Sequence, residues 1–543
     1  MSEPPGFGGP AGADGGAVAE WRRLDRRTLL VTAVIMAGVV IGAGVPAAVG
    51  MAGGMGPLKS AGWVSAGAAL LIVCGTGGDY IRWRRTRYRI GPERAELHTG
   101  LFLLRRRSLA RERIRSVDLT AHPLLRILGL VKVRIGTGEQ TGAGESTLEL
   151  DPVTRAEGER LRRELLDRAP GKPGAYDDST LASLDRRWIR YAPLSFAAPL
   201  LGASAAGGLV QLSEWFGVQL RLFAWLGDYF RAVSILWGSL VLLVVLALVG
   251  AIGALGLWVE MWWNYRLERE PGHTLRVRRG LLTSRSVSIE ERRLRGVELV
   301  EPLGVRMAGA ARVDAVATGF AQEEEDMRSD KKTLLPAAPR ALADAVAARV
   351  LREPVSPTSG VTLRPHPRAA RGRRLRWSLA YALLPVVVLA VLGLLLADVL
   401  LAVGAVCAVI SLPVAVLFAL DAYRNLGHGL SGGYLVARSG TLRRTTVALQ
   451  RGGVIGWTVR QSYFQRRAGL LTLTATTAAG EGAYHVYDAA RDEGLSFADE
   501  AVPGLLTPFL EPETEPEPEP DPEPEPEPEP EPKPDRDGTL RGT

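Results

Sequence analysis

Long apolar runs alternate with polar segments along this chain. Six runs are long enough to cross a bilayer as helices, which takes about 20 residues each. They cover residues 28–50, 60–78, 192–212, 232–259, 378–397 and 399–418. Because they come in three close pairs, each pair predicts a transmembrane helical hairpin. The first run is too long for the core of a cleavable signal peptide, and a second arm follows it at once.

The polar regions after the three hairpins share one pattern, which indicates three copies of one unit. When the copies are aligned on Gly100, Gly280 and Gly440, matching residues recur without a gap. An aliphatic residue stands fourteen positions after each anchor glycine, a small residue sixteen positions after it, and another glycine twenty-nine positions after it. The matching columns are Ile114, Leu294 and Val454; Ser116, Gly296 and Gly456; and Gly129, Gly309 and Gly469.

Within a unit the apolar positions alternate, which predicts strands. Residues 130–135 alternate apolar and basic side chains, and residues 470–474 alternate apolar and polar ones. We interpret Gly100, Gly280 and Gly440 as turn glycines between strands. Units one and two end in a helical pattern, which recurs at spacing four in the second. The pattern therefore predicts antiparallel strands closed by one C-terminal helix, as in a small β-sandwich or barrel.

These residues resemble a known family. A hairpin followed by Tyr88-Arg-Ile, a turn glycine, Arg113-Ile-Arg-Ser-Val-Asp118 and Leu128-Gly-Leu-Val-Lys-Val is similar to the bacterial pleckstrin-homology-like (PH-like) domain. Three such copies between hairpins resemble the YdbT-like membrane proteins over residues 20 to about 510. The third copy departs from the pattern at residues 450–455. The resemblance implies a bent seven-stranded sheet capped by a helix, a smaller YdbS-like membrane protein as partner, and no established reaction.

The predicted fold class is an α+β membrane protein in which three transmembrane hairpins alternate with three cytoplasmic PH-like β-sandwich or barrel units, each closed by a C-terminal helix. We call these units 1, 2 and 3. The expected hairpins are residues 21–83, 186–262 and 372–421, and the expected units are residues 84–170, 263–353 and 422–510, the last degenerate. The remaining segments are a disordered N-terminal arm (1–20), a linker (171–185), a basic linker (354–371) and an acidic disordered tail (511–543).

The distribution of positive charge predicts the topology. Arginines crowd the hairpin ends that adjoin the long polar segments, whereas the hairpin tips carry only Lys59, Arg221 and Arg231. By the positive-inside rule, both termini and all three units are cytoplasmic, and the protein is a multi-pass protein of the cell membrane. The tip of the second hairpin, residues 213–231, is aromatic and amphipathic, and we interpret it as an anchor in the outer interface rather than a lid over a ligand.

The acidic tail changes the meaning of the net charge. The chain carries a formal charge of +8, but residues 511–543 hold thirteen acidic and three basic residues, so the rest of the chain carries +18. Alternating Glu and Pro residues prevent helix and sheet formation and predict an extended, solvated segment. Such a tail either keeps the protein soluble or acts as a spacer or a lure for a basic partner.

Residues that support chemistry are scarce. No two of the six histidines lie at metal-ligand spacing, and Cys74 and Cys407 lie in apolar runs. Ser431 lies in a GxSxG sequence, but a strand is expected after it instead of the helix of a nucleophile elbow. We therefore predict no enzyme, no metal and no cofactor. The basic stretches lack interleaved aromatic residues and are tethered to hairpins, so no nucleic acid is expected as a partner.

One basic constellation gives a candidate binding site for lipids or a partner. It recurs between the anchor glycine and the following strand of the first two units, and it consists of Arg105, Arg106, Arg107, Arg111, Arg113, Arg115, Arg285, Arg292, Arg293 and Arg295. Arginines near a cytoplasmic leaflet gain on the order of 1 kcal/mol each from anionic lipid. The alternatives are a solvated strand face, and a partner protein that binds the apolar segment at Leu124, Leu125 and Leu128.

These patterns predict a non-catalytic membrane protein whose cytoplasmic units bind partner proteins or anionic lipid headgroups within a cell-envelope or stress-resistance complex. Membrane lipids and a YdbS-like protein are the expected partners, and the sequence is compatible with a homo-oligomer. The alternative is a six-helix transporter or lipid-translocating protein. A proton relay for transport would need carboxylates in the middle of a span, and none is present there, which disfavours this alternative.

Overall fold

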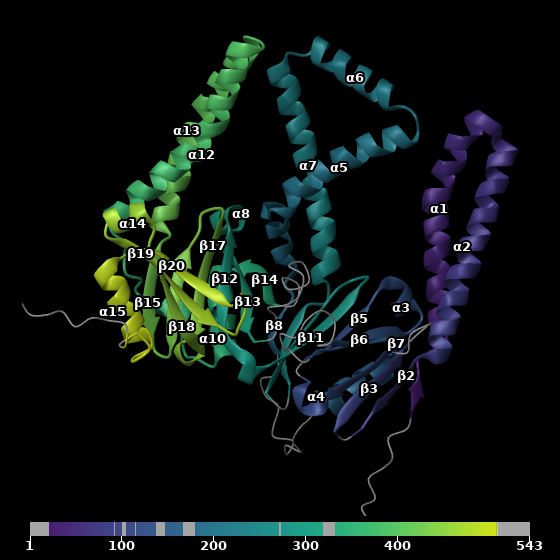
Figure 1. The fold of residues 1–543 in the computed structure, drawn as a ribbon, viewed down its shortest axis with the longest axis horizontal. Coiled ribbons are helices and arrows are strands. Elements are labelled where there is room, and N and C mark those ends of the chain that lie inside the picture. The colour runs from purple at the N-terminus through teal and green to yellow at the C-terminus, as the bar shows by residue number, and fades with distance from the viewer. Residues whose placement is uncertain are drawn as a thin grey trace, which may run out of the picture.

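The computed structural model of the chain describes residues 21–91, 93–99, 105–114, 116–136, 147–166, 180–270, 273–318, 332–506 and 508. Its helical hairpins all leave from one side of a layer of β-sheets (Figure 1). Gly100 and Arg115, the N-terminal arm and the acidic tail lie outside the described residues.

The three hairpins are built from seven helices. They are α1 (Thr28–Met55) and α2 (Pro57–Arg85); α5 (Ala197–Trp215), α6 (Gln219–Ala232) and α7 (Ile235–Trp262); and α12 (Arg368–Leu395) and α13 (Val399–Arg424). Five of them are long and apolar enough to cross a membrane. The third predicted run, residues 192–212, is instead broken: the 3-10 helix η2 (Arg186–Leu194) meets α5 at an angle of 63°. Pro193 lies within η2 and removes a backbone donor at this point.

Helices pack within each hairpin, and the hairpins stand apart from one another (Figure 1). The closest approach is between α5 and α7. A Cβ atom at Gly202 would lie 2.4 Å from the carbonyl oxygen of Leu246, and one at Gly250 would lie 2.1 Å from that of Ala198. Only glycine permits this contact between two backbones.

The strands and short helices repeat in each unit. Unit 1 contains β1 (Arg22–Arg23), β2 (Arg87–Ile90), β3 (Arg94–Thr99), β4 (Arg105–Ala110), η1 (Arg111–Arg113), β5 (Ser116–Ala121), α3 (Pro123–Ile127), β6 (Leu130–Gly136), β7 (Thr147–Thr154) and α4 (Arg155–Leu166). Unit 2 contains β8 (Thr180–Ser183), β9 (Arg266–Glu270), β10 (Thr274–Arg279), β11 (Ser284–Glu290), η3 (Glu291–Arg293), β12 (Leu294–Pro302), α8 (Leu303–Met307), β13 (Ala310–Ala317), β14 (Thr333–Pro339) and α10 (Arg340–Leu351). Unit 3 contains α11 (Pro357–Gly360), β15 (Gly427–Ser431), β16 (Tyr434–Ser439), β17 (Arg443–Gln450), η4 (Arg451–Gly453), β18 (Val454–Arg460), α14 (Tyr463–Arg467), β19 (Leu470–Thr477), β20 (Ala483–Ala490) and α15 (Arg491–Ala501).

Each unit begins before its hairpin, which differs from the division expected from the sequence. Strand β1 pairs with β2, and β8, in the segment expected to be a linker, pairs with β9. In unit 3 an isolated bridge between Arg364 and His428 takes the same place. The hairpin is therefore an insertion between the first and second strands of its unit, so both ends of each hairpin enter the same sheet.

The sheets are shared between neighbouring units, which the sequence did not indicate. Strand β5 of unit 1 pairs with β11 of unit 2, which gives a seven-stranded sheet of order β7-β6-β5-β11-β10-β9-β8. Strand β12 of unit 2 pairs with β17 of unit 3 in a six-stranded sheet of order β14-β13-β12-β17-β16-β15. The chain begins with the sheet β1-β2-β3-β4 and ends with the sheet β18-β19-β20. We call the β5–β11 and β12–β17 pairings the joints.

Glycines mark equivalent turns among the described residues of the copies. Gly280 and Gly440 have φ angles of 113° and 101°, and a Cβ atom on Gly280 would lie 1.9 Å from the carbonyl oxygen of Thr283. The glycines of the second column have φ angles of 65–70° and follow the short helices α3, α8 and α14; they are Gly129, Gly309 and Gly469. Their carbonyl oxygens accept hydrogen bonds from the first residues of α4, α10 and α15, so one backbone contact closes each unit.

A buried carboxylate connects hairpin 3 to unit 3. Asp488, which is completely buried, accepts hydrogen bonds from Arg373 (2.6 Å) and Arg374 (3.1 Å) at the base of α12, and from Gln465 of α14 (2.9 Å). Its backbone has a φ angle of 56°, a conformation that Asp and Asn tolerate better than other side chains.

Replacing Gly280 by Val should lower the free energy of unfolding by about 1–3 kcal/mol, because a β-branched side chain is strained at this φ and meets the Thr283 carbonyl. Gly452→Val is the matched control, since it is exposed and a Cβ atom there meets nothing within 4 Å. Thermal unfolding of the two purified variants measures the difference. Equal stability would contradict the role of this turn.

Replacing Asp488 by Asn should destabilise the protein by roughly 3 kcal/mol, because two arginines lose a buried counter-ion while the backbone conformation stays available. Glu500→Gln breaks an exposed pair with Arg364 and should change stability by less than about 1 kcal/mol. Chemical denaturation in detergent compares them. A silent Asp488→Asn variant would show that this network does not hold the hairpin.

Candidate functional site

The predicted basic constellation is divided between two ends of the strands. Arg106, which is exposed, and Arg107 lie on β4, and Arg285 is the second residue of β11. Arg292 and Arg293 lie on η3, where both contact Glu290 (3.4 and 3.1 Å). Of the others, Arg111 on η1 donates a hydrogen bond to the carbonyl oxygen of Glu164, and Arg295 lies against Gly453. Arg105 and Arg113 are on β4 and η1, and their side chains are outside the description.

The hairpin base fixes which end of the strands faces the membrane. Near the base of α7, Glu260 accepts hydrogen bonds from the backbone N–H groups of Leu282 and Thr283, both at 2.9 Å, in the turn before β11. Strand β11 runs away from this turn for seven residues, so η3 lies about 20 Å further from the hairpin. Arg292 and Arg293 are therefore at the far end of the unit.

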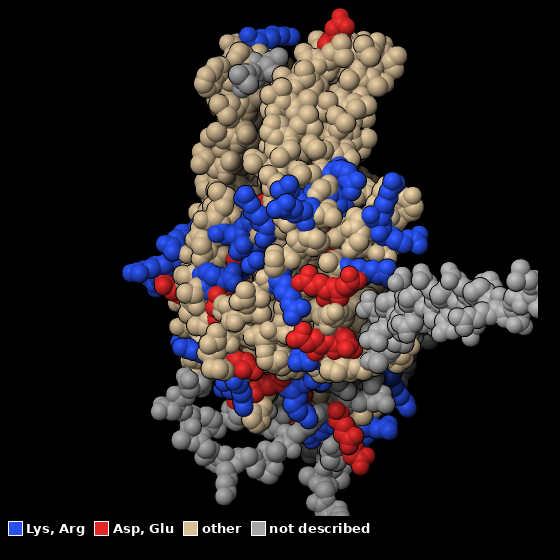
Figure 2. Space-filling view, turned by 90° about the vertical axis from the view of Figure 1, so that its left-hand side faces the viewer, with Lys and Arg blue, Asp and Glu red and all other residues tan. Residues whose placement is uncertain are grey.

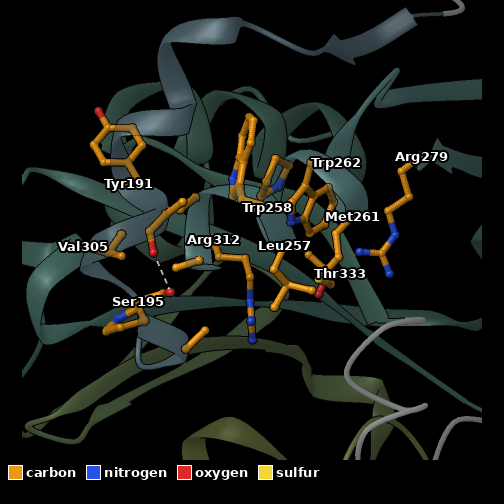
Figure 3. Close-up of a pocket in the computed structure, with 16 residues that line it drawn as sticks. Tyr191, Ser195, Leu257, Trp258, Met261, Trp262, Arg279, Val305, Arg312 and Thr333 are labelled. Atoms are coloured by element: carbon orange, nitrogen blue, oxygen red, sulfur yellow. Dashed lines mark hydrogen bonds between the residues drawn. The ribbon is translucent and has the colours of Figure 1, made fainter. Parts of the chain in front are cut away.

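A cavity of about 170 Å³ lies where hairpin 2 enters unit 2 (Figure 3). Its walls come from η2, the first residue of α5, the last three turns of α7, α8 and four strands (β10, β12, β13 and β14). In Figure 3 the aromatic rings of Trp258 and Trp262 lie on the helix side of the cavity, and Arg279 and Arg312 project from the strands. An apolar cavity of this size accommodates a group of roughly the volume of benzene.

Arg279, the last residue of β10, is the buried cation of the cavity. Only 4% of its surface is exposed, and its guanidinium lies 4.4 Å from the centre of the Trp262 ring. Burial and repulsion by Arg285, with a further contribution from Arg312, lower the pKa of Arg279 to about 10. The group remains charged at neutral pH, and an anion beside it would relieve both effects.

Arg312, on β13, supplies a second cation. Its Nη2 atom lies 2.8 Å from the completely buried Asp314, which Lys332 also approaches at 3.9 Å. The Nε atom of Arg312 and the indole Nε1 atom of Trp258 are buried with no hydrogen-bond partner among the residues that the structure describes. Buried donors of this kind are rare in proteins, and both line the same cavity.

The cavity lies at the height expected for lipid headgroups. Helix α7 has 28 residues and is about 42 Å long at about 1.5 Å per residue. A hydrocarbon core of about 30 Å leaves its last turns outside the core. Trp258, Trp262 and Trp263 fall in this part of the chain, where tryptophans concentrate at the membrane interface. Figure 2 shows Lys and Arg side chains gathered in a band just below the apolar hairpins.

Sequence patterns missed this cavity because its buried arginine does not recur in the other two units. The position of Arg279 is held by Thr99 in unit 1 and by Ser439 in unit 3, so alignment of the copies did not reveal it. The one available signal was the cluster of three tryptophans at residues 258–263, close to the end of an apolar run.

No other site of chemistry was found in the described parts of the chain. They contain no group of three His, Cys, Asp or Glu side chains that could hold a metal ion. Ser431 ends β15, and β16 begins three residues later, so the GxSxG sequence forms a turn between two strands. A nucleophile elbow requires a helix after the serine.

Comparison with known proteins also identifies three copies of one domain and a transmembrane relative. The profile described as "Bacterial PH domain" matches residues 30–169, 221–354 and 383–500. The chain is 23% identical over 435 residues to the UPF0699 transmembrane protein YdbT of Bacillus subtilis (strain 168), and the match covers 75% of this chain and 82% of that protein. No solved structure matches the chain. Because the profile covers most of the sequence in three copies, the chain is a membrane protein that belongs to the bacterial PH domain family.

Proposed function

We propose that this protein is a non-catalytic docking protein of the cell membrane, with its PH units in the cytoplasm, and that it binds an anionic lipid headgroup in the cavity at the base of hairpin 2. The observation that carries the proposal is the combination of two arginines and an apolar aromatic wall at the level of the headgroups. A phosphate group would accept hydrogen bonds from Arg279 and Arg312. The glycerol and acyl carbons would lie against Trp258, Leu257 and Met261.

Apolar side chains around the hairpin bases support contact with a membrane surface. Ile127 ends α3 and Met307 ends α8, at the same position of units 1 and 2, and each is 81% exposed. Arg27, beside α1, donates a hydrogen bond to Leu128 (2.8 Å), and Arg306 of α8 contacts Asp421 of α13 (2.9 Å). The two short helices therefore lie beside hairpin bases, where exposed apolar side chains and arginines can enter the interface together.

The arrangement of the helices disfavours a transporter. A transport path needs helices that enclose it, whereas these hairpins stand apart and present most of their surface to the outside. The helices are better suited to anchoring the units. The strand arginines, such as Arg105, Arg106 and Arg107, remain candidates for lipid or partner contact. A smaller YdbS-like membrane protein also remains a proposed partner.

The proposed topology can be tested by cysteine labelling. In a variant with Cys74 and Cys407 replaced by Ala, a Gly54→Cys substitution near the tip of hairpin 1 should react with an impermeant maleimide on intact cells. A Thr441→Cys substitution in the exposed turn of unit 3 should react only after the membrane is opened. The reverse pattern would overturn the cytoplasmic placement of the units.

Lipid binding can be tested with the full-length protein in nanodiscs. Replacing phosphatidylcholine by phosphatidylglycerol should raise the melting temperature of the wild type. The Arg312→Gln and Arg279→Gln variants should bind the anionic lipid about fivefold more weakly or worse, since one charge near a headgroup contributes on the order of 1 kcal/mol. The melting shift should decrease accordingly.

Two further variants distinguish lipid binding in the cavity from a general effect of the protein's charge. Arg292→Gln removes an exposed arginine on η3, far from the cavity, and should behave as the wild type. Ala254→Leu places a larger side chain in the cavity wall without changing charge, and should reduce the lipid effect as the arginine variants do. An equal response to phosphatidylglycerol in all variants would exclude the cavity as the binding site.

A further inference from the structure

The two joints use one register, although they connect different units. Counting from the anchor glycine of each unit, Leu119 and Leu299 both stand at position 19, and Ser286 and Thr446 both stand at position 6. Leu119 pairs with Ser286 at the first joint, and Leu299 pairs with Thr446 at the second. Position 19 of one unit thus faces position 6 of the next in both cases. Each unit therefore has a forward strand (β5, β12 or β18) and a receiving strand (β4, β11 or β17).

The three joined units form a row, and at each end of it one such strand takes part in no joint. Receiving strand β4 of unit 1 pairs with β3, and forward strand β18 of unit 3 pairs with β19, with no second partner among the described residues. Their exposure reflects this. Nearly all of β12 is buried within its joint, whereas most of β18 is open and Ile455 is 63% exposed. Next to β18, Tyr463 and Phe464 on α14 are 64% and 60% exposed.

A glycine in the unused forward strand matches the glycine that the second joint uses. At the second joint, a Cβ atom on Gly296 would lie 2.0 Å from the carbonyl oxygen of Ala448 on the receiving strand, so only glycine fits. Gly456 stands in the same column of unit 3, follows the same irregularity in the strand, and has nothing within 4 Å. No atom of the residues that the structure describes takes the place of a receiving strand beside Gly456.

We propose that β18 of one copy of this protein pairs with β4 of a second copy, in the register of the two internal joints. Val459 would then face Arg106, Thr458 would face Arg107, and Trp457 would face Ser108. Backbone groups of both edge strands would gain hydrogen-bond partners, which an open edge otherwise leaves to water or to adventitious pairing. This contact goes beyond the proposed lipid site and does not depend on it.

Three features of this chain favour a second copy as the occupant. The two free strands are of complementary kinds within one molecule. Since all hairpins leave the same side of the sheet layer, continuing the row keeps the next copy in the same membrane (Figure 1). The receiving strand β4 begins with three arginines. Unit 3, which carries the forward strand β18, is followed directly in the sequence by the thirteen acidic residues of 511–543, so the two ends of the chain carry opposite charge. In this register Arg460 stands opposite Arg105, a like-charge pair that by itself weakens the contact.

The contact is heterologous, because different surfaces of the two copies meet. Such contacts generate rings or open rows instead of closed dimers. Chemical trapping should therefore give a series of dimer, trimer and larger species.

Paired cysteines test the register in native membranes. In a background with Cys74 and Cys407 replaced by Ala, the pairs Val459→Cys with Arg106→Cys and Thr458→Cys with Arg107→Cys are each oxidised. Of two consecutive antiparallel pairs, one has the closer side chains, so at least one should form a disulfide. We expect a reductant-sensitive ladder, at least tenfold stronger than in the control Val459→Cys with Ala110→Cys, whose second site lies about 13 Å further along β4.

Several outcomes would overturn the proposal. One is the absence of a ladder from both in-register pairs, or a ladder no stronger than the control. Another is a Val459→Cys side chain that crosslinks to a different protein and never to a second copy. If the substituted proteins are poorly produced, the mass of the unmodified protein in nanodiscs decides, since a monomer at all concentrations would also exclude the contact. None of these results bears on lipid binding in the cavity.

Discussion

Strands β5 and β12 have neighbours on both sides only because the following unit supplies the second one, and this backbone pairing determines the form of the molecule. A strand in the interior of a sheet needs hydrogen-bond partners on both sides. In this chain β6 and β13 supply one side, and β11 and β17 of the following units supply the other. The pairing fixes each unit relative to the next, and because every hairpin is inserted at the same point of its unit, it also fixes the three hairpins on one side.

Buried ion pairs reinforce both joints, with different residues in each. At the first joint, Arg276 of unit 2 contacts Glu159 of unit 1 at 2.9 Å, and Arg162 of unit 1 contacts Glu270 of unit 2 at 2.8 Å. At the second joint, Glu301 accepts hydrogen bonds from Arg444 and Arg340, which lower its pKa despite its desolvation. Breaking such a pair leaves an uncompensated buried charge. Removing one member of such a pair would therefore destabilise its joint.

Sequence patterns predicted the repeated parts of the fold well, and for a physical reason. Apolar runs and alternating strands are local patterns, and turn residues such as Gly280 and Gly440 are constrained by φ angles that one residue determines. The joints are not local. Nothing in the sequence around Leu119 says that Ser286 is its neighbour. The roles of the charged side chains were harder to predict. Arg279 lines the cavity together with Trp262 and Arg312, which come from other elements, so the local sequence does not show this grouping. The basic run that begins at Arg105 is prominent in the sequence, but it does not indicate a pocket.

The three hairpin bases differ in the contacts that their side chains make, and this difference shows which residues are particular to the cavity. At the base of hairpin 1, the indole N–H of Trp83 donates to the carbonyl oxygen of Leu24 at 2.9 Å, and Arg26 stacks on the Trp83 ring. At the base of hairpin 3, Tyr423 donates to the carbonyl oxygen of His366 at 2.9 Å, close to the arginines that hold Asp488. At both bases, a side chain of the hairpin bonds to a backbone carbonyl near the start of the same hairpin. At the base of hairpin 2, a cavity lies between the helices and the strands, and buried donors line it. It reflects the particular residues of unit 2, which place positive charge where the other two units place an internal contact.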